Sequence, residues 1–220
     1  AYDCVIAPAL YSASEELLTA LNDYVQDGGH LISTFRSAFA DEQIKIYADT
    51  QPHVLHECLG IHYDQYTYPE DVKITLADGT TSACKYWMDM VSCDTAKPLC
   101  FYEHPAWNRY AAATVNTYGK GSALYLATMF DQAALTNILR DFFADADPSI
   151  LANSDCHFPV IIKEGTNDFG KKVRFYFNYS GEEQTVVCKG LSGTELLSGD
   201  KVSDGDTIQL NAWGFVIIEA

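Results

Sequence analysis

Residues 2–35, YDCVIAPALYSASEELLTALNDYVQDGGHLISTF, predict the fold of the first half of the chain. The apolar run at 4–7 is typical of a buried strand, and HLISTF at 30–35 is a second one. A strand, a helix and a second strand in this order form the crossover unit of a parallel sheet covered by helices, so we expect a three-layer α/β domain. The apolar face of the helix is predicted from residues that recur at helical spacing: Leu17, Leu18, Leu21, Tyr24 and Val25.

Both ends of this helix carry capping signals. Ser12 and Glu15 have the spacing of a capping box, which predicts that the helix starts there. Gly28-Gly29 follows the helix and precedes a strand, where a residue with positive φ often ends a helix. A phosphate-binding glycine loop would lie between a strand and the start of the next helix, and the segment in that place, APALYSAS at 7–14, has no glycine. Helix capping is therefore favoured over nucleotide binding.

The segment from 51 to 146 adds hairpins and a closing helix. QPHVLHECLG predicts a short helix ended by Gly60, and IHYDQYTY at 61–68 alternates as a strand. Asp78-Gly79 is a hairpin signal between two strand-like flanks. Further strands are expected in KPLCFYE and on both sides of the turn at 118–121, before an amphipathic helix at 131–146.

A domain boundary is predicted near residue 150. Pro148 and the polar run NSD at 153–155 end the helical periodicity, and strand-like segments separated by Gly, Asn and Asp turns follow from 158 onward. We expect residues 1–148 to form the α/β domain and residues 156–220 a small antiparallel all-β domain.

Composition excludes several kinds of partner. The formal net charge of -16 repels nucleic acid and anionic membranes, and no apolar run approaches the roughly 20 residues of a membrane helix. No secretion signal is recognisable at the start of the sequence. Seven scattered cysteines, an odd number in apolar contexts, suit buried thiols in a reducing compartment, so a cytoplasmic location is expected.

The usual motifs of enzyme chemistry are missing. Neither Gly-x-Ser-x-Gly nor Gly-x-Cys-x-Gly occurs, so no nucleophile elbow is predicted, and Cys58 is expected to be a buried helical residue. His53 and His56 could share a helix face, but no third ligand at diagnostic spacing and no Cys-x-x-Cys accompanies them. We expect no metal and no cofactor. Tryptophans 87, 107 and 213 are expected in the core or at an interface, with stacking on sugar rings as the alternative.

An ordered series of motifs resembles glycoside hydrolase family 42 β-galactosidases. The start of the chain through FRSAFADEQ at 35–43 is similar to the family's trimerisation domain, and LGIHYDQY and YGKGSALYLAT continue the match. FYFNYSGEEQTV, ELLSG and WGFVIIEA resemble its C-terminal domain in order. The resemblance covers essentially the whole chain.

This resemblance implies a non-catalytic assembly role. Family members carry an N-terminal (β/α)8 barrel that holds the acid/base and nucleophile glutamates, followed by a glutamine-amidotransferase-like, flavodoxin-like domain and a small β domain. The barrel needs roughly 250 residues, so no residue of this sequence is assigned a catalytic role. The parent enzyme would be a homotrimer that hydrolyses terminal β-D-galactosides with retention. Arg36, Asp41 and Glu42 are our candidates for a surface near the barrel or a partner, with an ordinary polar loop as the alternative.

Two other functions stay open at this point. One is an independent amidotransferase-like hydrolase whose nucleophile is Cys58, Cys84, Cys93 or Cys100, with a histidine such as His104 as its base. The other is a carbohydrate-binding module with Trp107 or Trp213 as its stacking platform.

Overall fold

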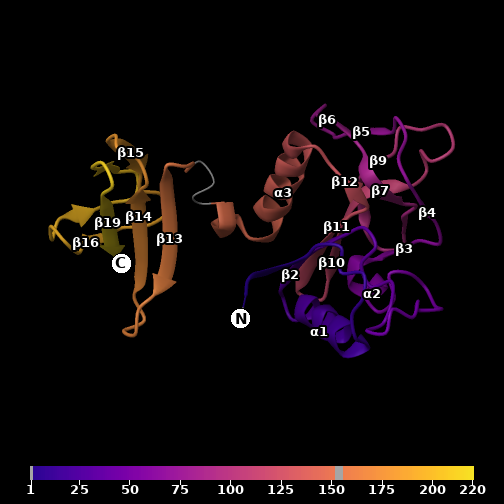
Figure 1. Ribbon diagram of the computed structural model, residues 1–220. Helices are drawn as coiled ribbons and strands as arrows, with labels where there is room; N and C mark the ends of the chain where they lie inside the picture. The colour runs from indigo at the N-terminus through magenta and orange to yellow at the C-terminus, as the bar shows by residue number, and fades with distance from the viewer. Residues whose placement is uncertain (1, 152–155) are drawn as a thin grey trace. The chain divides into compact units, whose positions relative to one another are not determined.

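The computed structural model describes residues 2–151 and 156–220, and NSD at 153–155 lies outside the described residues. The chain divides into two compact units, Ala1–Ala146 and Asp147–Ala220. The described residues contain three α-helices and nineteen mostly short strands, so the chain is largely β structure (Figure 1). Each unit has its own apolar core.

The first unit is built around a five-stranded mixed sheet. Its strand order is β1 (Cys4–Ala7), β2 (His30–Thr34), β11 (Gly121–Leu126), β10 (Ala111–Tyr118) and β9 (Lys97–Phe101). Strands β1, β2 and β11 run parallel, whereas β10 pairs antiparallel with both β11 and β9. The carboxyl ends of three parallel strands therefore meet at one edge of the sheet.

Helices cover both faces of this sheet (Figure 1). Helices α1 (Glu15–Gln26) and α2 (His56–Leu59) lie on one face, where the side-chain amide of Asn116 on β10 donates to the carbonyl of Cys58 at 2.9 Å. Helix α3 (Gln132–Ala146) lies on the other face, where Phe142 packs edge-on against His30 of β2. The three layers expected from the sequence are present in this unit.

The first helix starts later than its predicted capping box. Its N-cap is Ser14, whose Oγ accepts from the backbone N–H of Leu17 at 3.2 Å. Ser12 instead donates to the carbonyl of Asp41 at 2.8 Å, because a bridge to Ala40 holds it in extended conformation. The prediction of Ser12 as the N-cap was wrong.

The buried face of α1 also differs from its prediction. Leu18 and Val25 are buried as expected, but Leu17 is 46% exposed. Asn22 is buried in its place, and its Oδ1 accepts from the backbone N–H of Cys58 at 3.0 Å. This buried amide binds α1 to α2. The helix ends as predicted, since Gly28 has a φ of +119°.

Between β2 and α3 the chain also contains seven short strands that lie outside the five-stranded sheet. The single strand expected at 61–68 is two, because the first half pairs with β8 and the second with β7. The hairpin predicted at Asp78-Gly79 is present, with Gly79 at a φ of +86°. These strands are β3 (Ile61–His62), β4 (Tyr66–Thr67), β5 (Lys73–Thr75), β6 (Thr81–Ala83), β7 (Lys85–Asp89), β8 (Ser92–Cys93) and β12 (Thr128–Met129).

In the second unit every pairing among the described strands is antiparallel, as predicted. A five-stranded sheet of order β13-β14-β19-β16-β17 accompanies the pair β15-β18. Its core contains Tyr176 and Ile218, both fully buried. A 3₁₀ helix at Pro148–Leu151 precedes β13 (Val160–Thr166), β14 (Lys172–Asn178), β15 (Gln184–Val187), β16 (Gly193–Glu195), β17 (Lys201–Val202), β18 (Thr207–Leu210) and β19 (Phe215–Glu219).

Candidate functional site: an arginine in an aromatic box

The carboxyl ends of the parallel strands bring together residues that are far apart in the sequence. Tyr11 follows β1, and Arg36 and Phe39 follow β2. Asp89, at the end of β7, donates its backbone N–H to the carbonyl of Ala127, directly after β11, at 3.0 Å. Open α/β sheets bind their ligands at the carboxyl ends of their strands, so this edge is the candidate site.

Four aromatic rings surround the side chain of Arg36. Its guanidinium carbon lies 4.7, 5.0, 5.0 and 4.3 Å from the ring centroids of Tyr11, Phe39, Tyr66 and Trp87. The rings also contact one another, since Tyr66 stacks on Trp87 at 4.9 Å. A guanidinium at these distances is attracted by the negative faces of the rings. We call these five residues the Arg36 box.

The guanidinium of Arg36 has no hydrogen-bond acceptor among the described residues. Only its backbone N–H is engaged, and it donates to Oδ2 of Asp89 at 3.0 Å. The side-chain Nε is buried without a partner. A guanidinium carries five N–H donors and is charged at any physiological pH. The four rings thus surround a cation whose side-chain N–H donors have no acceptor among the described residues.

Asp89 is a buried carboxylate beneath the box. Its oxygens accept from the hydroxyl of Tyr125 at 2.7 Å and from the indole N–H of Trp87 at 3.0 Å, besides Arg36. Burial raises the pKa of Asp89 to about 6, although these hydrogen bonds act in the opposite direction. Asp89 therefore positions two members of the box: Arg36 through its backbone N–H, and Trp87 through its indole N–H. Sequence reasoning missed it; the available signal was an aspartate inside the apolar run YWMDMV.

The loops of this site contain strained backbone. Ala9, Arg36 and Ala38 have φ values of +46°, +58° and +54°, which side chains with a Cβ rarely adopt. Such conformations cost free energy and persist where the surrounding structure holds them, often at functional sites. Three of them at one sheet edge support a functional role for it.

Asp41 and Glu42, the other predicted interface residues, lie in the same loop and have different roles. The carboxylate of Asp41 accepts from the backbone N–H groups of Gln43 and Lys45, each at 2.9 Å, and so shapes a turn. Glu42 is exposed at the tip of this turn. The structure brings neither carboxylate into contact with the guanidinium of Arg36.

The candidate cysteine nucleophiles are not activated. Burial raises the pKa of Cys58, Cys84 and Cys100 to about 12, and it also raises the pKa of Cys93. His104 stacks on Trp107 at 3.8 Å and accepts the backbone N–H of Ala106. Within the described residues no histidine is hydrogen-bonded to a thiol, so no Cys–His pair is formed.

The candidate metal ligands do not converge. His53 contacts Asp49 at 2.7 Å and stacks on Tyr47 at 3.6 Å, whereas Nδ1 of His56 faces the carbonyl of His53 at 2.6 Å. In the described ranges, no three His, Cys, Asp or Glu side chains are grouped to hold a metal ion. The described residues also include no helix long and apolar enough to cross a membrane.

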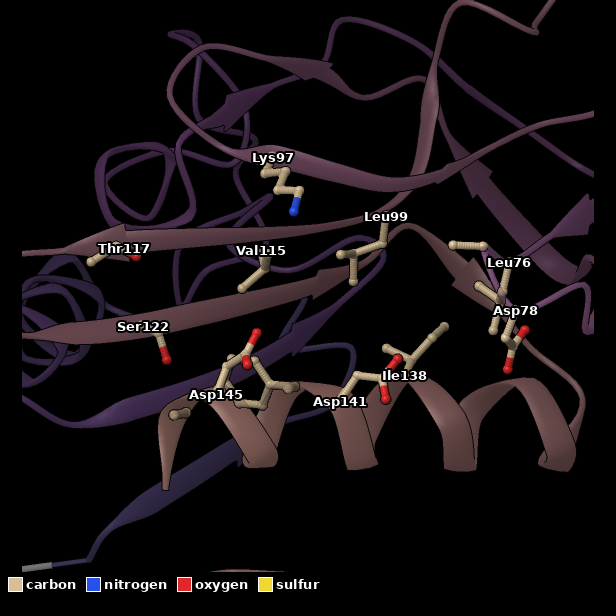
Figure 2. A pocket seen from close by; sticks show the side chains of 13 residues that line it. Leu76, Asp78, Lys97, Leu99, Val115, Thr117, Ser122, Ile138, Asp141 and Asp145 are labelled. Carbon is tan, nitrogen blue, oxygen red and sulfur yellow. The ribbon is translucent and has the colours of Figure 1, made fainter. Parts of the chain in front are cut away.

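A cavity of about 300 Å³ lies between α3 and the sheet (Figure 2). Its floor is apolar, with Leu99 and Val115 facing Ile138, and exposed Asp141 and Asp145 extend from α3 toward it. One helix is about 10 Å wide and strands are about 4.8 Å apart, so α3 alone leaves part of this face uncovered. The cavity follows from this incomplete cover.

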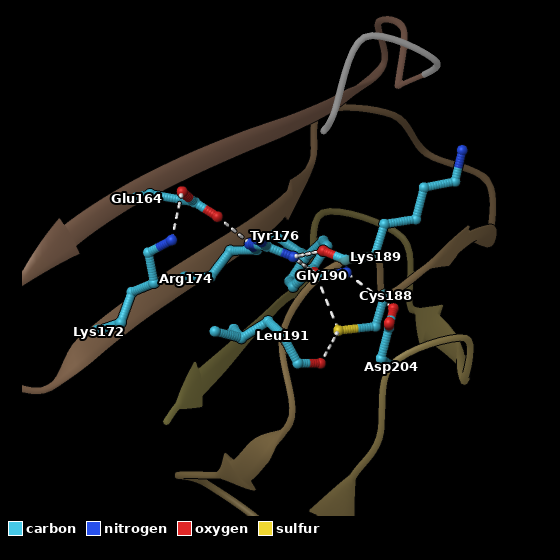
Figure 3. A network of polar contacts seen from close by, with 9 residues as sticks. All are labelled: Glu164, Lys172, Arg174, Tyr176, Cys188, Lys189, Gly190, Leu191 and Asp204. Carbon is cyan, nitrogen blue, oxygen red and sulfur yellow. Dashed lines mark hydrogen bonds and ion pairs between the residues drawn. The ribbon is translucent and has the colours of Figure 1, made fainter. Parts of the chain in front are cut away.

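The second unit contains a buried charge network (Figure 3). Arg174 is buried, and its guanidinium donates to Glu164, to the hydroxyl of Tyr176 at 3.1 Å and to the carbonyl of Lys189 at 2.6 Å. The Tyr176 hydroxyl in turn donates to Sγ of Cys188 at 3.4 Å. Arg174 is thus satisfied within the fold, in contrast to Arg36. Outside this network, Trp213 is 69% exposed at the turn before β19.

Comparison with known proteins identifies the family of the chain. Residues 1–148 match the family described as the β-galactosidase trimerisation domain, and residues 167–220 match the β-galactosidase C-terminal domain of the same glycoside hydrolase family. The chain belongs to the family 42 β-galactosidases. Its place in these enzymes is the C-terminal portion, as the sequence resemblance predicted.

Individual family 42 relatives agree with this assignment. β-Galactosidase LacA of Lactobacillus acidophilus is 30% identical over 91% of this chain, and BgaB of Geobacillus sp. is 34% identical over 65%. The chain spans 30% and 22% of the lengths of these relatives. The crystal structure of the β-galactosidase from Bacillus circulans sp. alkalophilus shares the fold, with a TM-score of 0.81 at 23% identity over 99% of this chain and 33% of its own.

Proposed function

We propose that this chain is the non-catalytic assembly and accessory portion of a β-galactosidase that hydrolyses terminal β-D-galactosides with retention. The observation that carries the proposal is the match of residues 1–148 to a trimerisation domain. The two catalytic carboxylates of a retaining glycosidase would lie in an N-terminal (β/α)8 barrel, which is the partner of these domains in the whole enzyme.

Within this proposal the two domains have distinct parts. Residues 1–148 form a glutamine-amidotransferase-like domain that builds a homotrimer, a fold supported by three parallel strands with helices on both faces. Arg36, Asp41 and Glu42 lie on its surface toward the barrel or a neighbouring subunit. Residues 156–220 form the accessory β domain. A cytoplasmic location is supported by seven cysteines that are all free thiols.

The mass of the chain in solution tests the assembly role. Multi-angle light scattering after size-exclusion chromatography should give three times the 24.4 kDa of one chain at micromolar concentration. A mass of 24.4 kDa at every concentration would show that these domains do not assemble without the barrel.

The hydrolysis of a chromogenic β-galactoside tests the non-catalytic role. The chain should release no product above a buffer blank, because the proposal assigns both catalytic carboxylates to the N-terminal barrel. Enzyme-like turnover that co-purifies with the chain would place catalysis in these domains and overturn the proposal.

A further inference from the structure

The Arg36 box combines a fixed, partly buried guanidinium with side-chain donors that have no acceptor among the described residues. Four ring centroids lie within 5.0 Å of the guanidinium carbon, and an anion would bind to the N–H donors along the edge of the guanidinium plane. No described residue accepts from these donors, because the contact of Arg36 with the neighbouring Asp89 is made through the backbone N–H and not through the guanidinium. A buried guanidinium donor without a hydrogen-bond acceptor is costly, and a planar carboxylate supplies two parallel acceptors for a guanidinium.

We propose that the Arg36 box receives an Asp or Glu carboxylate of a second copy of this protein, and that this contact anchors the assembly interface. The proposal rests on the assembly role inferred above and names the chemistry of the contact. Charge supports this occupant, because thirty acidic residues against fourteen basic ones make carboxylates the prevalent charged group on any copy. Arg36 is one of the fourteen basic residues that could bind such a carboxylate.

The surroundings of the box resemble a protein interface. Tyr66, a member of the box, is 43% exposed, and Tyr68, directly after β4, and Tyr86 on β7 are 65% and 67% exposed. Tyrosine, tryptophan and arginine are enriched in interfaces and dominate their binding energy. Tyr66 and Trp87 also order the guanidinium in advance, so little conformational entropy is lost when a carboxylate binds.

Substitution of Arg36 tests the proposal. Arg36→Gln removes the charge and the paired donors, and Arg36→Lys keeps the charge but not the planar fork. Sedimentation equilibrium should show subunit association weakened by about 30-fold or more in Arg36→Gln, the scale of an arginine hot spot, and by less in Arg36→Lys. Arg140→Gln is the matched control, because Arg140 is exposed on α3 and, among the described residues, its guanidinium donates only to Asn137 of its own helix.

A measurement on the unmodified protein covers the case in which Arg36 variants fail to fold. Phenylglyoxal reacts with accessible guanidinium groups, and peptide mass spectrometry can follow all four arginines. Arg36 should be protected at concentrations where the protein is assembled and become reactive on dilution into subunits. Exposed Arg109 and Arg140 should react equally in both states, and buried Arg174 in neither.

The outcomes separate this proposal from the assembly role. If the wild-type chain assembles but Arg36→Gln associates as tightly and Arg36 is never protected, the carboxylate contact is overturned and the assembly role stands. If the wild-type chain is monomeric at every concentration, the carboxylate contact is overturned as an anchor of assembly, and these domains do not assemble without the barrel. Weakened association in Arg36→Gln with concentration-dependent protection of Arg36 supports the contact.

Discussion

Three residues of the site, Ala9, Arg36 and Ala38, hold backbone conformations that favour glycine. Glycine cannot replace Arg36 without loss, because the arginine side chain fills the aromatic box. Ala38 is fully buried, so its methyl group contributes packing. Ala9 is exposed, so its side chain neither occupies the aromatic box nor contributes buried packing. The strain at Ala9 can therefore be relieved without loss of packing.

We predict that Ala9→Gly stabilises the first unit by about 1 kcal/mol, the usual cost of a left-handed residue with a Cβ. Urea denaturation followed by circular dichroism would measure it. Ala20→Gly, at an exposed position inside α1, is the control and should destabilise by about 1 kcal/mol. If Ala9→Gly destabilised the protein as Ala20→Gly does, the backbone at Ala9 would not be strained.

Asp89 predicts a pH dependence of stability. Its folded pKa of about 6 lies above the ordinary 3.8, so the folded protein binds this proton more tightly than the unfolded chain does. The contribution of Asp89 to the free energy of unfolding must then increase as the pH falls from about 7 to 4, by on the order of 2 to 3 kcal/mol.

Asp89→Asn isolates this contribution, because asparagine does not titrate. Denaturation of both proteins from pH 4 to pH 8 should show wild type gaining stability relative to the variant at low pH. Parallel curves across this range would mean that Asp89 titrates normally in the folded protein.

Sequence reasoning found one part of this site and missed the rest. Arg36 could be proposed because it lies in FRSAFADEQ, which resembles the trimerisation domain of the family. Tyr66, Trp87 and Asp89 could not, because β4 and β7 are inserted elements whose position over the carboxyl end of the sheet depends on long-range pairing. Local periodicity carries no information about such pairing.

At the scale of elements, the turn between β10 and β11 packs closely against the end of α1. A Cβ on Gly121 would lie 2.1 Å from the carbonyl oxygen of Gly29 and 2.4 Å from that of Val25. Both atoms belong to the backbone and cannot rotate away. Glycine at 121 is therefore what allows the helix and the hairpin to approach.

We predict that Gly121→Ala destabilises the first unit by about 2 to 3 kcal/mol, the range of overpacked substitutions. Chemical denaturation measures it. Gly165→Ala on β13 is the control for the same chemical change, since no atom of the described residues lies within 4 Å of the added Cβ. A neutral Gly121→Ala would mean that α1 and the hairpin can separate at little cost.

Element prediction succeeded where the signals were local. The helices, the Asp78-Gly79 hairpin and the antiparallel strands after residue 158 follow from periodicity and turn residues. The start of α1 was misplaced by two residues because Ser12 and Ser14 are both competent caps. Only the tertiary bridge between Ser12 and Ala40 decides between them.

At the scale of the whole molecule, seven free thiols are distributed over both units. Burial raises the pKa of Cys58, Cys84 and Cys100 to about 12, which leaves about one in ten thousand of these thiols ionised at pH 8. Iodoacetamide should therefore spare these three in the native protein and label all seven in urea, as peptide mass spectrometry would show.

Unusually fast alkylation of one buried cysteine in the native protein would contradict this prediction. If Cys58, Cys84 or Cys100 reacted faster in the native chain than a cysteine in an unfolded peptide, it would be an activated nucleophile. The independent hydrolase would then regain support over the assembly role.

The parallel pairing of β2 with β11 also sets the order of events during synthesis. His30 lies opposite Ser122, 92 residues later, whereas β10 and β11 are neighbours in sequence. A ribosome adds roughly 5 to 20 residues per second, so β2 waits roughly 5 to 20 s for its central neighbour. Throughout that interval only β1 can cover one of its edges, and the nascent chain exposes the other to chaperones and to other nascent chains.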